Sequence, residues 1–474
     1  MPTFYVENFG CRATQADGAA IERQFLDRGL EPALLPAQAE IVVLNTCTVT
    51  ASADQDARAA IRRIHRQNPA CQIIVTGCYA QRAPAEIAPL AGVTQVIGNS
   101  HKHSLAELAL SHTEEQAITN GDFIPASALV PRGRPSNAGI FVSDIFAHTE
   151  LIAAPVFDSA NERTRPNLKV QDGCDNRCSF CIIPSVRGQS RSLPLDRVLH
   201  DVQRLVESGY REVVISGINL GRWGRDFEPQ ARFEDLVRAL LDQTGLEKLR
   251  ISSVEPMDWS DELIALVSNA RRIAKHAHVP MQSGSDRILR AMHRKYRPWH
   301  YREKIERIHN AIPTAAIGAD VMTGFPGETD ADFEQTRRMI EDLPFTYLHV
   351  FTYSSRPGTP SAAIPDQVPV YVARERTRIL RELGEAKKLA FMHSFEGKSL
   401  EAITLNTARG DFTEALTDNY LKLRLRGRHQ ANRWLVAKIE LLSEGALTGA
   451  LMPGQVTGSL LPTPAASRPT APAL

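Results

Sequence analysis

The sequence lacks any apolar run of the roughly 18 residues needed to span a bilayer. Its N-terminal segment, MPTFYVENFG, has neither the basic stretch nor the apolar core of a secretory signal peptide. These absences predict a cytoplasmic protein without membrane contact. The chain also lacks an excess of positive or negative charge, since 55 Lys and Arg balance 54 Asp and Glu. Any basic surface that binds nucleic acid must therefore be local.

Cysteine is scarce as well, with seven residues in a chain of 474. In a reducing compartment these residues are expected to stay as thiols, which argues against a disulfide framework. Their distribution is uneven. Four lie early in the chain and three share one short loop: Cys11, Cys47, Cys71 and Cys78, then Cys174, Cys178 and Cys181.

Most of the chain alternates β-branched apolar runs with amphipathic helical stretches, a pattern typical of α/β proteins with a parallel sheet covered by helices. It predicts a doubly wound parallel domain over residues 1–111. Six further strand–helix rounds over 166–396 predict a partial (β/α)6 barrel instead of a full eightfold one. Residues 112–165 collect Pro, Gly, Asn and Ser, and are expected to form an irregular connector.

The C-terminal part is rich in short strand-like runs, which predict a small antiparallel β-barrel over 397–461. The Pro- and Ala-rich segment 462–474 predicts a disordered tail. In the run KLRLR, basic side chains alternate with leucines and therefore share one strand face. We expect an RNA backbone to contact this basic face, and a merely solvated strand is the alternative. The basic residues of this stretch are Lys422, Arg424, Arg426, Arg428, Arg433 and Lys438.

The loop DGCDNRCSFCIIP follows the first predicted barrel strand, at the carboxyl end where such barrels carry their active sites. Its three cysteines have the spacing to bind three irons of a [4Fe–4S] cluster, leaving the fourth iron open for a substrate or cofactor. Structural zinc sites usually use two paired cysteine knuckles, and the sequence has no second pair. We therefore predict a cluster at Cys174, Cys178 and Cys181.

Three of the early cysteines, Cys11, Cys47 and Cys78, each follow a predicted strand of the first domain. Because the carboxyl ends of parallel strands share one rim, these thiols are expected to converge as a second cluster site, with ordinary buried thiols as the alternative. Cys71 precedes its strand, so it is expected at the opposite rim as a partly buried thiol.

The cysteine loop, with the aromatic Phe180 before its last cysteine, resembles the signature of radical S-adenosylmethionine (SAM) enzymes. The runs NFGCRATQ, NTCTVTASAD, VTGCYAQ and KVQDGCDNRCSFCIIPSVRGQSRS resemble the methylthiotransferases of that superfamily, as do HVPMQSGSDRILRAM, GFPGETDADF and YSSRPGTPSA. NTCTVT, KVQDGCDNRC and SSVEP look most like the MtaB-type branch. The resemblance covers nearly the whole chain except the connector, and it includes a TRAM-like C-terminal barrel.

The resemblance implies two [4Fe–4S] clusters and SAM as cofactors, with tRNA and an electron donor protein as partners. Members of the branch convert the adenine C2–H of N6-threonylcarbamoyladenosine beside the anticodon to C2–SCH3. One cluster, at Cys174, Cys178 and Cys181, cleaves SAM to a radical. The other, at Cys11, Cys47 and Cys78, presents the sulfur. No side-chain acid or base can usefully activate that C–H bond, so no catalytic side chain is predicted.

Four further residues are predicted to contact SAM or the substrate. Gly217 and Asn219 end the second barrel strand, where the superfamily binds the methionine amino group, and Gly217 permits close backbone approach. Phe180 is expected near the SAM adenine, or else in the core. Glu255 is expected to meet the ribose or the threonyl group, or else to be a solvated carboxylate.

Two positions depart from the family pattern: Thr14 stands where Asn is frequent, and Ser216 where Thr is frequent. Neither side chain is an iron ligand, so only local hydrogen bonding is in doubt.

The Gly-rich GFPGE is not a phosphate loop, because no Lys-Ser/Thr follows it. Two rival functions remain open. One is a methylthiotransferase for isopentenyl-adenosine or a ribosomal-protein aspartate, and the other is a non-catalytic zinc protein that binds RNA.

Overall fold

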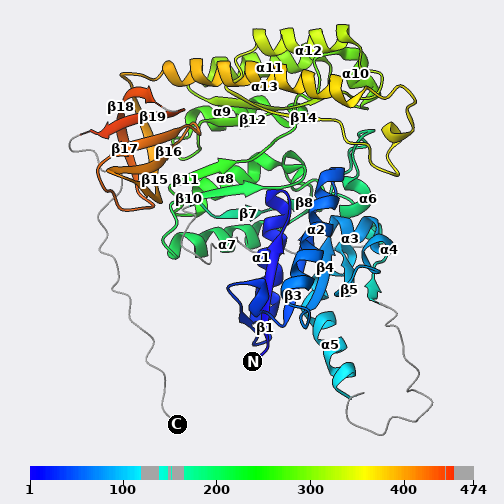
Figure 1. Cartoon of the computed structure of the whole chain (residues 1–474). Helices are drawn as coiled ribbons and strands as arrows, with labels where there is room; N and C mark the ends of the chain where they lie inside the picture. The colour runs from blue at the N-terminus through cyan, green and yellow to red at the C-terminus, as the bar shows by residue number, and fades with distance from the viewer. Residues whose placement is uncertain (119–137, 148–150, 152–164, 444, 453–474) are drawn as a thin grey trace, which may run out of the picture. The chain divides into compact units, whose positions relative to one another are not determined.

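The first part of the chain forms a parallel six-stranded sheet in the order β2-β1-β3-β4-β5-β6. Its strands β1, β3, β4 and β5 are labelled and drawn in blue in Figure 1. The computed structural model describes residues 1–118, 138–147, 151, 165–443 and 445–452. The predicted disordered tail lies outside these residues. The strands are β1 (Thr3–Asn8), β2 (Glu31–Pro32), β3 (Ile41–Thr46), β4 (Gln72–Gly77), β5 (Val93–Gly98) and β6 (Gly139–Phe141).

Helices cover both faces of this sheet, which confirms the doubly wound prediction. Alternate residues of β3 serve the two faces: Val42 and Leu44 pack under α2, α3 and α4, while Ile41 and Val43 pack under α1 and α5. The helices are α1 (Arg12–Leu26), α2 (Ala51–Gln67), α3 (Cys78–Arg82), α4 (Pro84–Ile87) and α5 (Leu105–Ile118).

Part of the predicted connector is regular. Helix α5 continues to Ile118, and β6 pairs in parallel with β5, so the expectation of irregular structure is wrong for these described residues. Most of the remaining connector, residues 119–137, 148–150 and 152–164, lies outside the described part of the chain. A three-residue strand has no readable period, and its formation depends on the edge that β5 offers.

Six parallel strands follow in sequence order, which confirms the partial barrel. They pair as two groups of three, β7-β10-β11 and β12-β13-β14, and single bridges such as Ser253 to His278 join the groups. The strands are β7 (Asn167–Lys169), β10 (Glu212–Ser216), β11 (Lys248–Ile251), β12 (His276–His278), β13 (Ala316–Thr323) and β14 (Tyr347–Thr352). A short hairpin, β8 (Gln171–Asp172) with β9 (Arg191–Ser192), ties together the two ends of the cysteine loop.

The helices that follow the strands lie outside the barrel, except α6, which follows the cysteine loop and contacts α3 of the N-terminal domain. The helices are α6 (Ile183–Arg187), α7 (Leu195–Glu207), α8 (Phe233–Gln243), α9 (Asp261–Asn269), α10 (Asp286–Ala291), α11 (Pro298–Ala311), α12 (Asp330–Asp342) and α13 (Val370–His393). Short 3-10 helices occupy several loops: η1 (Pro36–Gln38), η2 (Asn99–Ser104), η4 (Ile145–Ala147), η5 (Leu220–Arg222), η6 (Pro256–Asp258) and η7 (Pro360–Ala363). No helix of the described residues is both long and apolar enough to cross a membrane.

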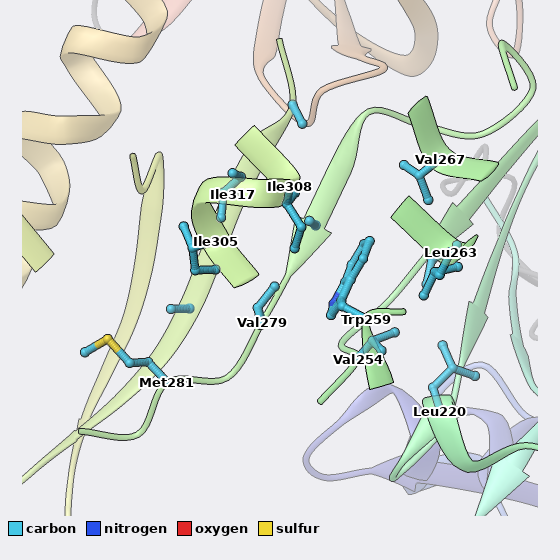
Figure 2. Packing of buried hydrophobic residues seen from close by; sticks show 14 of the residues in the cluster. Leu220, Val254, Trp259, Leu263, Val267, Val279, Met281, Ile305, Ile308 and Ile317 are labelled. Carbon is cyan, nitrogen blue, oxygen red and sulfur yellow. The ribbon is translucent and has the colours of Figure 1, made fainter. Parts of the chain in front are cut away.

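The barrel core fills the space between these helices and the strands. Figure 2 shows Trp259 among Val254, Leu263 and Ile308, all of them buried. Ile305 and Ile308 stand three positions apart on α11, so both side chains face this core. The N-terminal sheet and the barrel together make one compact unit, Met1–Phe391.

The second compact unit, Met392–Leu474, contains a closed barrel in the order β15-β16-β17-β19-β18. Neighbouring strands of this barrel pair antiparallel, except for β17 with β19, which pair in parallel. The predicted small barrel is confirmed. It has a fifth strand, which the sequence did not indicate. The strands are β15 (Ser399–Arg409), β16 (Phe412–Thr417), β17 (Lys422–Arg426), β18 (Trp434–Ser443) and β19 (Ala446–Leu451).

Replacing Ile308 by Ala should lower the free energy of unfolding of the barrel by about 2–5 kcal/mol, because a buried cavity forms beside Trp259. Urea unfolding followed by tryptophan fluorescence measures this loss. Glu303→Ala, on the exposed face of the same helix, is the control and should change the free energy by less than about 0.5 kcal/mol. Equal effects of the two variants would contradict this packing.

Candidate active site

Cys11, Cys47 and Cys78 follow three adjacent strands of the N-terminal sheet: β1, β3 and β4. Cys11 precedes α1 and is exposed, while Cys47 and Cys78 are buried. The other two thiols lie near Cys47, because burial, then the nearby Cys78 and then Cys11 raise the pKa of Cys47 to about 12. The structure thus brings them together at the predicted rim.

Glycines next to these cysteines allow the close approach. A Cβ on Gly10 would lie 2.7 Å from the Cβ of Cys47, and one on Gly77 would lie 2.3 Å from the carbonyl oxygen of Thr46. Both residues also have positive φ, at 106° and 97°, which favours glycine. Cys71 lies apart from them, buried in the hydrophobic core on the α2 face, as expected for an ordinary thiol.

Cys174, Cys178 and Cys181 lie in the loop between β8 and α6. The Cys174 amide donates to the carbonyl of Gly188 (3.1 Å), which closes the base of the loop. Burial raises the pKa of Cys181 to about 12, with Cys178 and then Cys174 as additional negative neighbours. These three thiols therefore share one small volume as well.

Several N–H groups point at the sulfur atoms of this loop. Cys174 Sγ accepts from the Asn176 amide (3.4 Å) and from Asn219 Nδ2 (3.5 Å), and Cys178 Sγ accepts from Arg294 Nη1 (3.2 Å). Hydrogen bonds to thiolate sulfur stabilise its negative charge and tune the potential of a bound cluster. This donor set suits thiolates that carry a metal cluster.

The end of β10 leaves buried polar atoms without partners. Ser216 Oγ and Asn219 Oδ1 are buried and accept or donate no hydrogen bond in the described part of the chain, and the same holds for Gln282 Oε1. An unpaired buried polar atom is costly and calls for a ligand or water. Ser216 ends β10, and Asn219 follows that strand and donates to Cys174, so a polar cofactor at this rim fits these residues.

Gly217 is approached closely, although by another side chain. A Cβ there would lie 2.8 Å from Gln171 Oε1, and that oxygen accepts from the Asn219 amide at 2.7 Å. Phe180 is partly buried and packs against the barrel core. The predicted SAM contacts of Gly217 and Phe180 therefore stay predictions, and packing accounts for both residues in this structure.

Glu255 is held by an ion pair with Arg294, and Arg294 also donates to Cys178. The Glu255 carboxylate therefore lies beside the cysteine loop and is not simply a solvated group at the rim. Arg294 is buried, and although burial disfavours its charge, Tyr296, Glu255 and Cys178 raise its pKa further above the usual value. Sequence reasoning missed Arg294, since an arginine beside a helix end carries no distinctive spacing.

A buried network of charges joins the two cysteine sites. Asp17 of α1 contacts Lys102 (3.0 Å), Lys169 and Arg187 (3.0 Å). Asp172 contacts Lys169 (2.8 Å) and Arg187 (2.9 Å) in turn. Burial alone would raise the pKa of Asp17, yet its cationic neighbours lower it to about 2. We call these five residues the charge network.

The charge network has two carboxylates and three cationic groups, so it carries a surplus positive charge. Burial disfavours the charge of Arg187, but Asp172, Cys78, Asp17 and Cys11 raise its pKa above the usual value. Ile182 and Val186, which follow the second cysteine group, pack directly on Cys78. The surplus charge therefore lies where bound clusters with thiolate ligands would need compensation.

A second contact between sheet and barrel uses the run YSSRPGTPSA. Arg356 donates to Thr48 Oγ1 (2.8 Å) and forms an ion pair with Asp54, which also pairs with Arg82 (3.0 Å). Thr48 is the residue after Cys47, so Arg356 anchors the loop of that cysteine. The departure at Thr14 is accommodated locally, because its hydroxyl lies 3.6 Å from Cys11 Sγ.

On the C-terminal barrel, β17 alternates as predicted: Leu423 and Leu425 are buried, and Lys422 and Arg426 are exposed. The basic face is partly compensated, since Arg426 forms a 3.0 Å ion pair with Glu440 of β18. Sequence reasoning missed this acidic partner because it lies on a different strand.

Two family models match the chain. That of the radical SAM superfamily covers residues 168–340, and that described as uncharacterized protein family UPF0004 covers residues 3–98. Among solved structures, the radical SAM methyltransferase TsrM from Kitasatospora setae superposes with a TM-score of 0.55 over 76% of this chain and 77% of that chain, at 16% identity. That likeness concerns the fold. The cysteine loop and barrel thus define a radical SAM protein, and this class implies a [4Fe–4S] cluster and SAM.

Relatives cover almost the full length. The threonylcarbamoyladenosine tRNA methylthiotransferase MtaB of Aquifex aeolicus is 34% identical over 90% of this chain and 97% of its own, and that of Bacillus subtilis 35% over 94% and 95%. A tRNA-2-methylthio-N(6)-dimethylallyladenosine synthase of Thermobifida fusca is 32% identical over 85% of this chain and 77% of its own. The chain belongs to the radical SAM methylthiotransferase family and is most like its MtaB branch.

Replacing Asp17 by Asn should destabilise the Met1–Phe391 unit by about 3–5 kcal/mol, because three buried cations would share one remaining carboxylate. Urea unfolding followed by far-ultraviolet circular dichroism measures the change. Asp27→Asn is the matched control, since Asp27 ends the same helix in an exposed pair with Arg23. If both variants unfold at the same urea concentration, the network does not stabilise the unit.

Proposed function

We propose that this protein converts N6-threonylcarbamoyladenosine next to the tRNA anticodon into its 2-methylthio derivative. The observation that carries the proposal is the pairing of two three-cysteine groups across a shared buried charge network. The names of the MtaB relatives support the choice of substrate. A methylthiotransferase for the dimethylallyl (isopentenyl) adenosine is the second candidate, because some relatives carry that name.

In this proposal Cys174, Cys178 and Cys181 hold the cluster that binds SAM. A second cluster, which the superfamily as a whole does not imply, is held by Cys11, Cys47 and Cys78. When bound, these groups supply the radical and sulfur chemistry that an unactivated adenine C–H bond requires. Electrons come from a donor protein.

The chain's own side chains bind, orient and shield these groups. Arg294 and Asn219 donate to the sulfur atoms of the SAM-binding loop, and the unpaired oxygens of Ser216, Asn219 and Gln282 are available to the polar end of SAM. Glu255, paired with Arg294, keeps a negative charge at the same rim and orients the guanidinium.

Iron content tests the second cluster. After anaerobic reconstitution the full chain should bind about eight irons, and the triple variant Cys11→Ser, Cys47→Ser, Cys78→Ser about four, since one cluster remains. The triple variant should still cleave SAM reductively. Cys71→Ser is the control and should keep all eight irons. Two zinc ions and no brown colour would favour the rival zinc protein, and unchanged iron in the triple variant would refute the assignment.

Nucleoside mass spectrometry tests the substrate. In a strain that lacks this gene and any paralogue, 2-methylthio-N6-threonylcarbamoyladenosine should vanish from tRNA while N6-threonylcarbamoyladenosine accumulates. Loss of the 2-methylthio isopentenyl nucleoside instead would select the second candidate. Loss of β-methylthioaspartate from a ribosomal protein would instead select the rival methylthiotransferase that acts on a ribosomal-protein aspartate.

The C-terminal barrel is proposed to be a TRAM-like domain that binds the tRNA backbone. The double variant Lys422→Ala, Lys438→Ala removes two exposed lysines of this barrel and should reduce the slope of log affinity against log salt by about 2. Filter binding at several salt concentrations measures the slope. Arg338→Ala with Lys388→Ala removes the same charge from exposed helix positions, and it should leave the slope unchanged.

A further inference from the structure

Three neighbouring barrel strands bring together a third set of side chains of the types that can bind a metal, far from any cysteine in sequence. His278 ends β12, Asp320 lies in β13 and His349 lies in β14. Strand register places them side by side, since His278 pairs with Gly318 and Asp320 pairs with His349. One ligand atom from each lies within 4.8 Å of the other two.

These side chains face away from the helices. Ala277, Ile317 and Ala319, which alternate with them along the strands, belong to the apolar core. Since successive side chains of a strand point to opposite faces, the two histidines and the aspartate face the inside of the barrel. We call them the lumen triad.

The distances suit a shared ion. Asp320 Oδ1 lies 3.1 Å from His278 Nε2 and 3.3 Å from His349 Nδ1. Ligand bonds of about 2.0–2.1 Å at tetrahedral or octahedral angles separate neighbouring ligand atoms by about 3.0–3.4 Å. These two distances are therefore those of neighbouring ligands on one ion, and the two imidazole nitrogens lie within 4.8 Å of each other.

A neighbouring tyrosine orients the first ligand. The Tyr347 hydroxyl lies 2.9 Å from His278 Nδ1 and 2.7 Å from His276 Nε2, so Nδ1 of His278 is engaged and Nε2 is directed at Asp320. The ring lies over Gly318, where a Cβ would be 1.9 Å from it, so only glycine admits the ring there. Such outer partners set the orientation of metal-binding histidines.

The charge of Asp320 has no Lys or Arg to balance it within the described residues, because its ion-pair partners are the two imidazoles. The side chain of His349 is 63% exposed and that of Asp320 28%, while His278 is buried at 8%. An ion can therefore reach the lumen triad from solvent and still keep coordination positions open.

We propose that the lumen triad binds one divalent transition-metal ion of the zinc class. Two imidazole nitrogens and one carboxylate oxygen match the preference of such ions, whereas magnesium and calcium prefer all-oxygen sites. The ion ties together β12, β13 and β14 inside the barrel. This site shares no residue with the cysteine groups and does not depend on the proposed substrate.

Zinc binding to the reconstituted full chain tests the proposal. Equilibrium dialysis against buffered free Zn²⁺, with metal analysis of the protein, should give one zinc per chain in addition to the cluster irons. His349→Gln should weaken that binding at least tenfold, and Asp320→Asn should do the same. Because His349 is exposed, its replacement is expected to leave the fold and the iron content unchanged.

His300→Gln, at an exposed position of α11, is the matched control and should bind zinc like the unaltered chain. Zinc-edge absorption spectra should show nitrogen and oxygen ligands without sulfur. The proposal is overturned if no zinc binds beyond the clusters, if His349→Gln and Asp320→Asn bind it as tightly as His300→Gln, or if sulfur ligands appear. In the first two cases the lumen triad shares a proton between imidazole and carboxylate.

Discussion

The structure of the Met1–Phe391 unit depends on the buried charge network between the N-terminal sheet and the barrel. Buried ions are costly unless each is paired, so Asp17 and Asp172 must meet Lys102, Lys169 and Arg187 in one arrangement. Asp17 lies six residues after Cys11, and Asp172 lies two residues before Cys174. The cost of separating these charges therefore holds one cysteine group against the other.

The same constraint serves the chemistry of a methylthiotransferase. In the proposed assignment, two groups of thiolates that hold clusters would bring negative charge into a site with little solvent, and the surplus cation of the network would oppose it. Arg294 does the same for the loop of Cys174, Cys178 and Cys181, where it is shared between Cys178 and Glu255. Arg356 of the barrel adds a third cationic contact, a hydrogen bond to Thr48 in the loop of Cys47. Arginines of the barrel thus hold the cysteine loops of both domains in place.

Sequence reasoning succeeded where chemistry follows from position along a strand. Cysteines directly after parallel strands had to share a rim, and Cys71, before its strand, had to lie elsewhere; the structure has both. It failed where a partner comes from another element. Arg294, Gln282 and the ion pair of Arg426 with Glu440 have no spacing signal, and β6 is too short to have a period. Gly217 was correctly singled out for a close approach, but Gln171 makes that approach here.

The sequence by itself determined the strand–helix alternation, the two cysteine groups and the family, because these rest on local periodicity and spacing. Only the tertiary structure decided which charges face each other across the sheet and the barrel, and that His278, Asp320 and His349 meet on one inner face. Those contacts join residues tens to more than a hundred positions apart. Their geometry is set by strand register and by the packing of whole layers, neither of which is encoded in any short stretch of chain.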